Sequence, residues 1–291
     1  MLNKPAEGFD VTLGNNFIAF MFDEIRYELD GVEIDRNRNV GITSTLKNYV
    51  TISSDRTMIM RNAGWDAQTN ANGYFNFYYK RIVINARHKL ILIRSRNDKN
   101  CLIGNLALEP VINIFKIQCM DFRSLDFYEF PLLQGITKHS WATQLEKPRY
   151  VVFADRKNVM SEETSRFDDC RLNNVKLYLN SECYPYDDMN LAFDKNRWSI
   201  LYDTYQRFCK NYYGYMYLEP SLTVTQFLHN GPFVIIYYSR QNESVKSATV
   251  DVRLEFECKE NVLMNTTAYC LIIHDCMIQY NPLTNVVRKM I

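Results

Sequence analysis

Hydrophobic and polar residues alternate along much of this chain, which is the pattern expected of half-buried β-strands. In residues 24–29 the apolar side chains occupy the odd positions and the charged side chains the even positions. Asp30 and Gly31 follow, and residues 32–35 resume the alternation. An Asp-Gly pair between two alternating segments is a strong hairpin signal, because both turn positions must tolerate a positive φ. The pattern therefore predicts a β-hairpin over residues 24–35.

Further strands are predicted wherever short alternating or apolar segments recur. They are residues 49–52, 81–85 and 90–94 in the first half, and residues 150–154, 175–179, 233–238, 249–258 and 268–273 in the second. Residues 86–88 are interpreted as the turn between two of these strands. Residues 249–258 give the clearest amphipathic pattern, with Val250, Val252, Leu254 and Phe256 on one face and charged side chains on the other.

One segment predicts a helix. Leu201, Tyr205, Phe208 and Tyr212 follow one another at spacings of four, three and four, which places them on one helical face. Asp194 lies just upstream and is expected to cap the N-terminus of this helix.

Antiparallel strands with a single inserted helix favour an all-β sandwich or jelly roll over alternating βαβ units. Polar residues and Pro148 precede the second group of strands, so a domain boundary is expected near residues 137–148. The length of 291 residues agrees with two domains.

Composition adds limits on partners and compartment. The chain has 34 Lys and Arg against 33 Asp and Glu, a balance that disfavours a protein that binds DNA directly. The longest apolar segments, such as residues 233–238, are too short to span a bilayer. The N-terminal residues lack the apolar core of a signal peptide, and the eight cysteines show no CxxC spacing. We therefore expect an intracellular protein with reduced thiols and no membrane partner.

Candidate chemistry is sparse. His88, His139, His229 and His274 are isolated from one another in the sequence, so no metal ligands are assigned. His274 and Cys276 share a strand face, but nothing nearby suggests an oxyanion hole, and the cysteine is interpreted as inert. The adjacent acids Asp168–Asp169 and Asp187–Asp188 do not by themselves form an acid/base pair. We expect no catalytic, cofactor-binding or metal-binding residues, no cofactor and no small-molecule substrate.

Two biased segments leave alternatives open. Residues 80–100 carry seven basic residues and one acidic residue, and Arg94 and Arg96 are expected on one side of their strand. This segment indicates either a basic surface for an acidic partner or a solvated face balanced by the acidic residues 161–194. The seven aromatic side chains of residues 202–217 favour packing or subunit contact, with stacking on a ligand as the alternative.

Several segments resemble one known family. They are residues 22–36, 81–96, 144–150, 174–182, 184–187, 239–243, 250–260 and 280–283, and they span most of the chain from about residue 20. In these segments the chain resembles the double jelly-roll-like proteins related to the major capsid proteins of Maverick/Polinton elements and adintoviruses.

The resemblance implies two eight-stranded jelly rolls, with residues 1–144 forming the first and residues 145–291 the second. It implies assembly in threes and no catalysis. The leader before residues 15–24 and the connections at residues 74–80 and 141–157 are shorter than in the family. The first jelly roll is therefore expected to be incomplete at its N-terminus, with unpaired sheet edges.

These observations lead to one functional hypothesis and one alternative. The hypothesis is a non-catalytic, capsid-like structural protein that self-associates as a trimer and touches nucleic acid only indirectly. The alternative is a degenerate or host-retained copy that acts as a protein-binding module without capsid assembly. An enzyme would need a bound metal. The expected location is the cytoplasm or nucleus, or the virion where the gene belongs to an active element.

Overall fold

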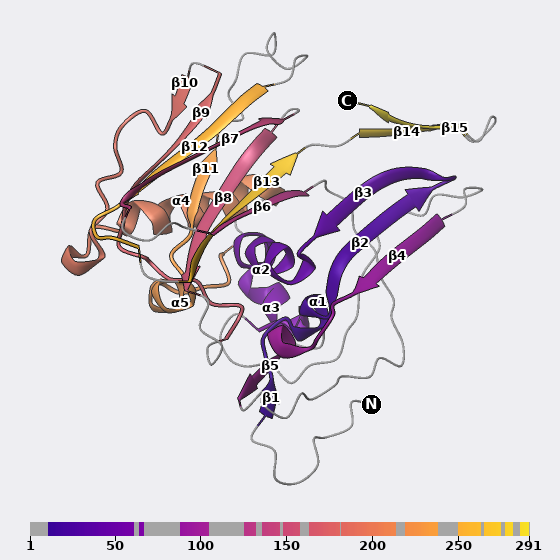
Figure 1. Cartoon of the computed structure of the whole chain (residues 1–291), viewed down its shortest axis with the longest axis horizontal. Helices are drawn as coiled ribbons and strands as arrows, with labels where there is room; N and C mark the ends of the chain where they lie inside the picture. Colours follow the sequence, from indigo (N-terminus) through magenta and orange to yellow (C-terminus); the bar gives the residue numbers. More distant parts are fainter. Residues whose placement is uncertain are drawn as a thin grey trace. The chain divides into compact units, whose positions relative to one another are not determined.

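The chain is divided into two units, each with its own antiparallel sheets (Figure 1). Unit 1 comprises residues 1–125, 160–165 and 276–291, and unit 2 comprises residues 126–159 and 166–275. This computed structural model describes residues 11–60, 64–66, 88–104, 125–131, 136–145, 148–157, 163–180, 182–213, 219–237, 250–262, 265–274, 277–281 and 286–290.

Two four-stranded sheets form the body of unit 2. The first has the order β11-β8-β13-β6, and the second has the order β10-β9-β12-β7. The strands are β6 (Leu125–Pro131), β7 (Lys138–Leu145), β8 (Pro148–Lys157), β9 (Leu172–Leu179), β10 (Glu182–Tyr184), β11 (Val234–Tyr237), β12 (Val250–Cys258) and β13 (Thr266–His274).

The order of these strands is nested. The first strand in the chain, β6, lies beside the last, β13, and β7 lies beside β12. Further in, β8 lies beside β11 and β9 beside β10. A long hairpin of paired strands that folds over into two facing sheets gives this order, and it is the topology of a complete jelly roll.

The five strands predicted in this half are confirmed as β8, β9, β11, β12 and β13, although Tyr238 and Thr249 lie outside the described residues. Strands β6, β7 and β10 were not predicted. The expected boundary segment 137–148 contains β7, whose pairing with β12 places it in unit 2. The expected break between residues 144 and 145 falls at the end of β7, so it would separate β6 and β7 from their partners. The first jelly roll at residues 1–144 stays a prediction.

The two sheets pack face to face through apolar side chains. Phe153 on β8 meets Phe256 on β12, with 4.7 Å between ring centroids. The alternating face of β12 that was predicted to be apolar is buried at Val252, Leu254 and Phe256. Asp251 and Arg253 of the same strand are exposed, so the outer face of this sheet is in contact with solvent at β12.

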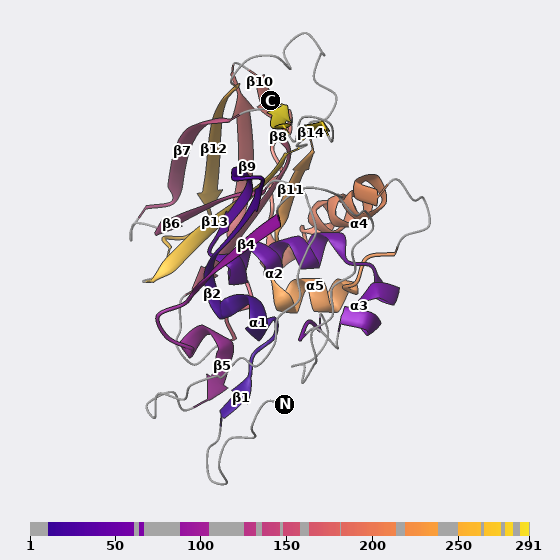
Figure 2. The ribbon, with the colours of Figure 1, turned by 90° about the vertical axis from the view of Figure 1, so that its right-hand side faces the viewer.

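Strand β8 is buried on both faces, because residues 150–156 are all buried. Two helices follow the β10 strand, α4 (Ser199–Tyr213) and α5 (Val224–Asn230). Helix α4 lies beside β11 (Figure 2). The Tyr150 ring of β8 meets the Phe208 ring of α4 with centroids 4.7 Å apart. Helix α4 therefore covers the outer side of this sheet.

The predicted helix is confirmed, since Leu201, Tyr205, Phe208 and Tyr212 are all buried on α4. The predicted cap is wrong: Asp194 lies in the 3₁₀ turn η4 (Phe193–Lys195), before α4 begins at Ser199.

The aromatic segment packs within unit 2. Tyr205 stacks on Phe227 of α5 at 5.3 Å between centroids, and its hydroxyl accepts a hydrogen bond from the Leu222 backbone N–H at 3.1 Å. The interpretation as packing is thus confirmed for these residues, whereas Tyr215 and Tyr217 lie outside the described residues.

Unit 1 combines small sheets with helices. Its strands are β1 (Val11–Leu13), β2 (Phe22–Leu29), β3 (Val32–Arg38), β4 (His88–Arg94), β5 (Leu102–Gly104), β14 (Met277–Asn281) and β15 (Val286–Met290), paired as β1-β5, β3-β2-β4 and β14-β15. Its helices are α1 (Phe17–Phe20), α2 (Val40–Thr51), α3 (Ser54–Met60) and the 3₁₀ turn η2 (Lys99–Cys101). The expectation of a single helix is wrong, because α5 and the helices of unit 1 were missed.

The hairpin prediction is confirmed. Strands β2 and β3 pair from Leu29↔Val32 onward, and the connecting residues have φ of 48° at Asp30 and 81° at Gly31. Two positive φ values are what a type I′ turn requires.

The prediction of a strand at residues 49–52 is wrong, since residues 40–51 form α2. Helix α2 buries residues at helical spacing, namely Ile42, Leu46, Tyr49 and Val50. The last residues of this helix include β-branched side chains, and this short segment was mistaken for a strand. The predicted strand at residues 90–94 is confirmed in β4, which begins already at His88, a residue assigned to the turn. Residues 81–85 lie outside the described residues.

Helix α2 is held to the start of unit 1 by buried polar contacts. The Asn16 side-chain amide donates hydrogen bonds to Ser44 Oγ at 2.7 Å and to Thr45 Oγ1 at 2.9 Å. Gly41, one turn earlier on α2, lies directly against the buried Phe20 ring of α1. The close approach of α1 and α2 therefore depends on glycine, which has no Cβ, at residue 41.

This close approach gives a testable prediction. Alanine normally favours a helix interior over glycine by about 1 kcal/mol. At Gly41 the added Cβ would overlap the Phe20 ring. We expect Gly41→Ala to destabilise unit 1 by about 1–3 kcal/mol in urea unfolding. Gly14→Ala is the matched control, because its Cβ would meet its neighbours at 3.5 Å or more. Equal stability of the two variants would contradict the packing argument.

Candidate functional site

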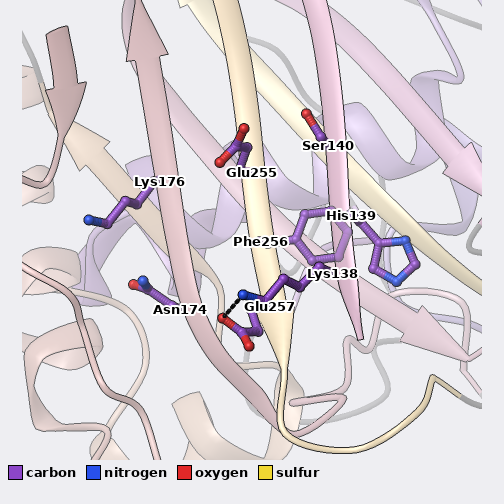
Figure 3. A pocket seen from close by; sticks show the side chains of 8 residues that line it. All are labelled: Lys138, His139, Ser140, Asn174, Lys176, Glu255, Phe256 and Glu257. Carbon is purple, nitrogen blue, oxygen red and sulfur yellow. Dashed lines mark ion pairs between the residues drawn. The ribbon is translucent and has the colours of Figure 1, made fainter. Parts of the chain in front are cut away.

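The outer face of the β10-β9-β12-β7 sheet carries a depression of about 280 Å³. Eight residues from β7, β9 and β12 line it: Lys138, Ser140, Asn174, Lys176, Glu255 and Glu257 at outward positions, and His139 and Phe256 at the inward positions between them (Figure 3). Strand pairing places the polar members in two rows across the sheet. Glu257 lies opposite Lys138 and Asn174, and Glu255 lies opposite Ser140 and Lys176.

The charges of this face are already paired with one another. Lys138 Nζ lies 3.5 Å from Glu257 Oε2, the ion pair drawn in Figure 3. Lys176 Nζ lies 2.7 Å from Asp188 Oδ1, and this ion pair lowers the pKa of Asp188. A shallow, solvated surface with mixed charge suits recognition of another protein surface.

His139 is half-buried and packs on a neighbouring aromatic ring. Its ring stacks on Phe256 with 4.9 Å between centroids, and its Nε2 lies 3.2 Å from the Ile136 carbonyl oxygen. Burial lowers its pKa, while the carbonyl contact raises it, and burial is the larger effect. His139 therefore contributes to the packing at this end of the sheet.

The other histidines give no cluster within the described part of the chain. His229 is exposed near the end of α5, whereas the side chains of His88 and His274, and Cys276, lie outside the described residues. No group of three or more His, Cys, Asp or Glu among the described residues is arranged to hold a metal ion. No helix in the described residues has the length and apolar character needed to cross a membrane.

The two acidic pairs have different surroundings. Asp188 is held by Lys176 and by the Asn174 side chain, which donates to it at 2.9 Å. Asp168 instead lies beside Asp155, an acid that sequence reasoning missed. The Asp168 backbone N–H donates a hydrogen bond to the Asp155 backbone carbonyl oxygen at 2.8 Å.

Asp155 is the unusual carboxyl group of unit 2. It is only 3 % exposed, and neither of its carboxyl oxygens has a hydrogen-bond partner. It lies on the same alternate positions of β8 as Phe153, which faces the second sheet. Burial, with a smaller contribution from the charge of Asp168, raises the pKa of Asp155 well above 3.8. The signal in the sequence was a lone acid at the end of the apolar residues 150–154.

Buried thiols in both units are poor nucleophiles. Burial, followed by the charge of Asp98, raises the pKa of Cys101 to about 12. Burial, followed by the charge of Asp155, raises the pKa of Cys258 to about 12. Because the thiolate is the reactive form, these groups are unreactive at neutral pH.

Two residues of the basic segment are paired with acids of unit 1. Lys89 Nζ lies 3.1 Å from Glu28 Oε2, and Arg94 pairs with the buried Asp98. Arg94 also donates to the Met21 carbonyl oxygen at 2.7 Å. For Lys89 and Arg94 the balancing acids are therefore Glu28 and Asp98 of unit 1.

A second charged surface lies on the β3-β2-β4 sheet of unit 1. Three arginines, Arg26, Arg36 and Arg38, surround Glu24 and Glu33, with ion-pair distances from 2.8 to 3.6 Å. The hydrogen bond from Arg26 is the main reason that the pKa of Glu24 is lowered. Sequence reasoning identified the hairpin but did not single out this network.

The nested eight-stranded arrangement of unit 2 defines an all-β protein of the jelly-roll class. Residues 11–120 and 118–278 match the double jelly roll-like domain family, and the chain belongs to this family. The second matched segment contains all the strands from β6 to β13.

A solved structure with a similar fold is the crystal structure of VP54 of the virus PBCV-1, fitted into a cryo-EM reconstruction of the virophage Sputnik. It has a TM-score of 0.52 and 10 % sequence identity, and the match covers 97 % of this chain and 87 % of VP54. The PBCV-1 virus capsid in a quasi-atomic description has a TM-score of 0.45 and 10 % identity, covering 92 % of this chain and 85 % of that one. A comparison with curated protein sequences finds no match.

The buried carboxyl group gives a prediction about pH. Above pH 3.8 the unfolded chain releases the Asp155 proton, whereas the folded unit retains it until the raised pKa is reached. In this window the stability of unit 2 falls by about 1.4 kcal/mol per pH unit through this group. We expect Asp155→Asn to remove this pH-dependent loss of stability. The free energy of unfolding of the variant, relative to that of the wild type, then increases as pH rises. Urea unfolding at several pH values above 3.8 measures the difference.

Glu219→Gln serves as the control, because Glu219 is exposed on unit 2 and its charge is not enclosed by the sandwich. Parallel pH profiles for wild type and Asp155→Asn would contradict the argument for a buried, protonated carboxyl group.

Proposed function

We propose that this protein is a non-catalytic, capsid-like structural protein that self-associates through its two jelly rolls as a trimer. The observation that carries the proposal is the complete, nested jelly roll of unit 2 in a chain that belongs to the double jelly roll-like domain family. The fold is also that of VP54, a protein that has been fitted into the reconstruction of a virus particle.

The surfaces of the described residues support contacts with protein. The outer face of the β10-β9-β12-β7 sheet and the β3-β2-β4 face both carry charges of mixed sign in ordered pairs. Such pairs set the register between protein surfaces more than they add affinity. The near-neutral charge of +1 supports contact with other copies over direct coating of nucleic acid.

The proposal also concerns the origin of the gene and the location of the protein. We propose a relationship to the capsid genes of Maverick/Polinton elements and adintoviruses, on the segments that resemble them. The protein then resides in the cytoplasm or nucleus, and in the virion where its gene belongs to an active element. It requires no cofactor and no small-molecule substrate.

Self-association is tested on the purified full chain. We expect light scattering coupled to size-exclusion chromatography to give three times the chain mass of 34.4 kDa, with negative-stain images of ring-shaped particles. A strictly monomeric protein at high concentration would contradict the proposal. A monomer that recovers one cellular protein in stoichiometric amount in a pulldown would instead support a host-retained binding module.

A further inference from the structure

Tyr186 is the most exposed large hydrophobic side chain of the described residues, at 87 %. It lies in the connection between β10 and η4, directly before Asp187, which is also exposed. Burial of large aromatic side chains dominates interface energies, so a fully presented tyrosine is an unused source of binding energy in a monomer.

The connection that carries Tyr186 is anchored on both sides. Before it, the Tyr184 hydroxyl donates to Glu182 Oε2 at 2.5 Å. After it, Asp188 is held by Lys176 at 2.7 Å, and the Met189 backbone N–H donates to Asn174 Oδ1 at 3.0 Å. An anchored segment loses little conformational entropy on binding, so Tyr186 is preorganised for contact.

The surroundings of Tyr186 are acidic. Glu182, Asp187 and Asp188 contribute three negative charges, and Lys176 contributes one positive charge, which leaves a surplus of two negative charges. The complementary surface must therefore offer apolar area for the ring and positive charge beside it.

The β3-β2-β4 face of unit 1 has both properties. Ile93 on β4 is 43 % exposed, and it lies in the same cross-strand row as Glu24 and Arg38. The Arg38 side chain is 72 % exposed and has a single long ion pair, 3.4 Å to Glu24. Three arginines against Glu24 and Glu33 leave a surplus of one positive charge around this row.

We propose that Tyr186 and Asp187 of one copy dock on Ile93 and Arg38 of a second copy of this chain. The Tyr186 ring covers the Ile93 side chain and lies against the Arg38 guanidinium, which favours aromatic faces. Asp187 pairs with Arg38. The inference rests on the proposed self-association and names the residues that carry one of its contacts.

This contact joins two different surfaces, so it is heterologous. A heterologous contact generates a closed ring when its rotation closes and an open filament when it does not. It therefore suits an assembly of three copies, in which each copy offers its tyrosine to one neighbour and its arginine face to the other.

Four variants test the contact through sedimentation of the full chain over a range of concentrations. We expect Tyr186→Ser and Asp187→Lys to weaken self-association by roughly tenfold or more, the effect of losing an interface anchor. Tyr186→Phe retains the ring and is expected to associate like the wild type. The double variant Asp187→Lys with Arg38→Glu reverses both charges and is expected to recover the association that Asp187→Lys alone loses.

Asp203→Lys is the control for the charge change, because Asp203 is an exposed carboxylate on α4 outside this contact. Thermal unfolding by circular dichroism checks that each variant is folded. Full association of both Tyr186→Ser and Asp187→Lys in a self-associating wild type would overturn the contact and leave the proposed function standing. A monomeric wild type would overturn both.

A cross-link locates the contact directly. A photoreactive benzoylphenylalanine at position 186, in a mixture of isotope-labelled and unlabelled copies, is expected to link to peptides carrying residue 38 or 93 of another copy. Links from position 186 to any other surface, or to residues of its own copy alone, would overturn the assignment.

Discussion

Unit 2 depends on the pairing of β8 with β13 at the centre of its sheet. These strands pair from Thr266↔Lys157 to Ile273↔Tyr150, and nearly all of their side chains in this register are buried on both faces. Apolar strands with two faces to cover need a layer on each side. The second sheet supplies one layer through Phe256, and α4 supplies the other through Phe208. Strands β6 and β11 flank this pair and complete the four-stranded sheet.

How far the sequence predicted the fold depended on how fully each element is buried. The two-sided apolar strands β8 and β13, the alternating β12 and the amphipathic α4 were all recognised. Strand β7 was missed because its inward positions are His139, Trp141 and Thr143, a pattern with little aliphatic character. Tertiary packing, not local pattern, decides such strands.

The candidate surfaces were harder to predict than the core. The rows of the outer face require the register between β7, β9 and β12, which pairs residues more than 70 positions apart. The buried Asp155 was visible in the sequence only as an acid after an apolar segment. Its carboxyl oxygens have no hydrogen-bond partner, and its pKa is raised by burial and by the charge of Asp168. These surroundings arise from tertiary packing, which local sequence spacing does not reveal.

Unit 1 is assembled from three separate stretches of the chain, and unit 2 lies between them in sequence. The Asn15 backbone N–H donates to Glu163 Oε1 at 3.0 Å, and β15 contacts β3. Synthesis on the ribosome proceeds from the N-terminus, so nearly all of unit 2 has emerged before the last hairpin of unit 1 exists. Unit 2 can fold during translation, whereas unit 1 also needs β14 and β15, which follow unit 2 in the sequence.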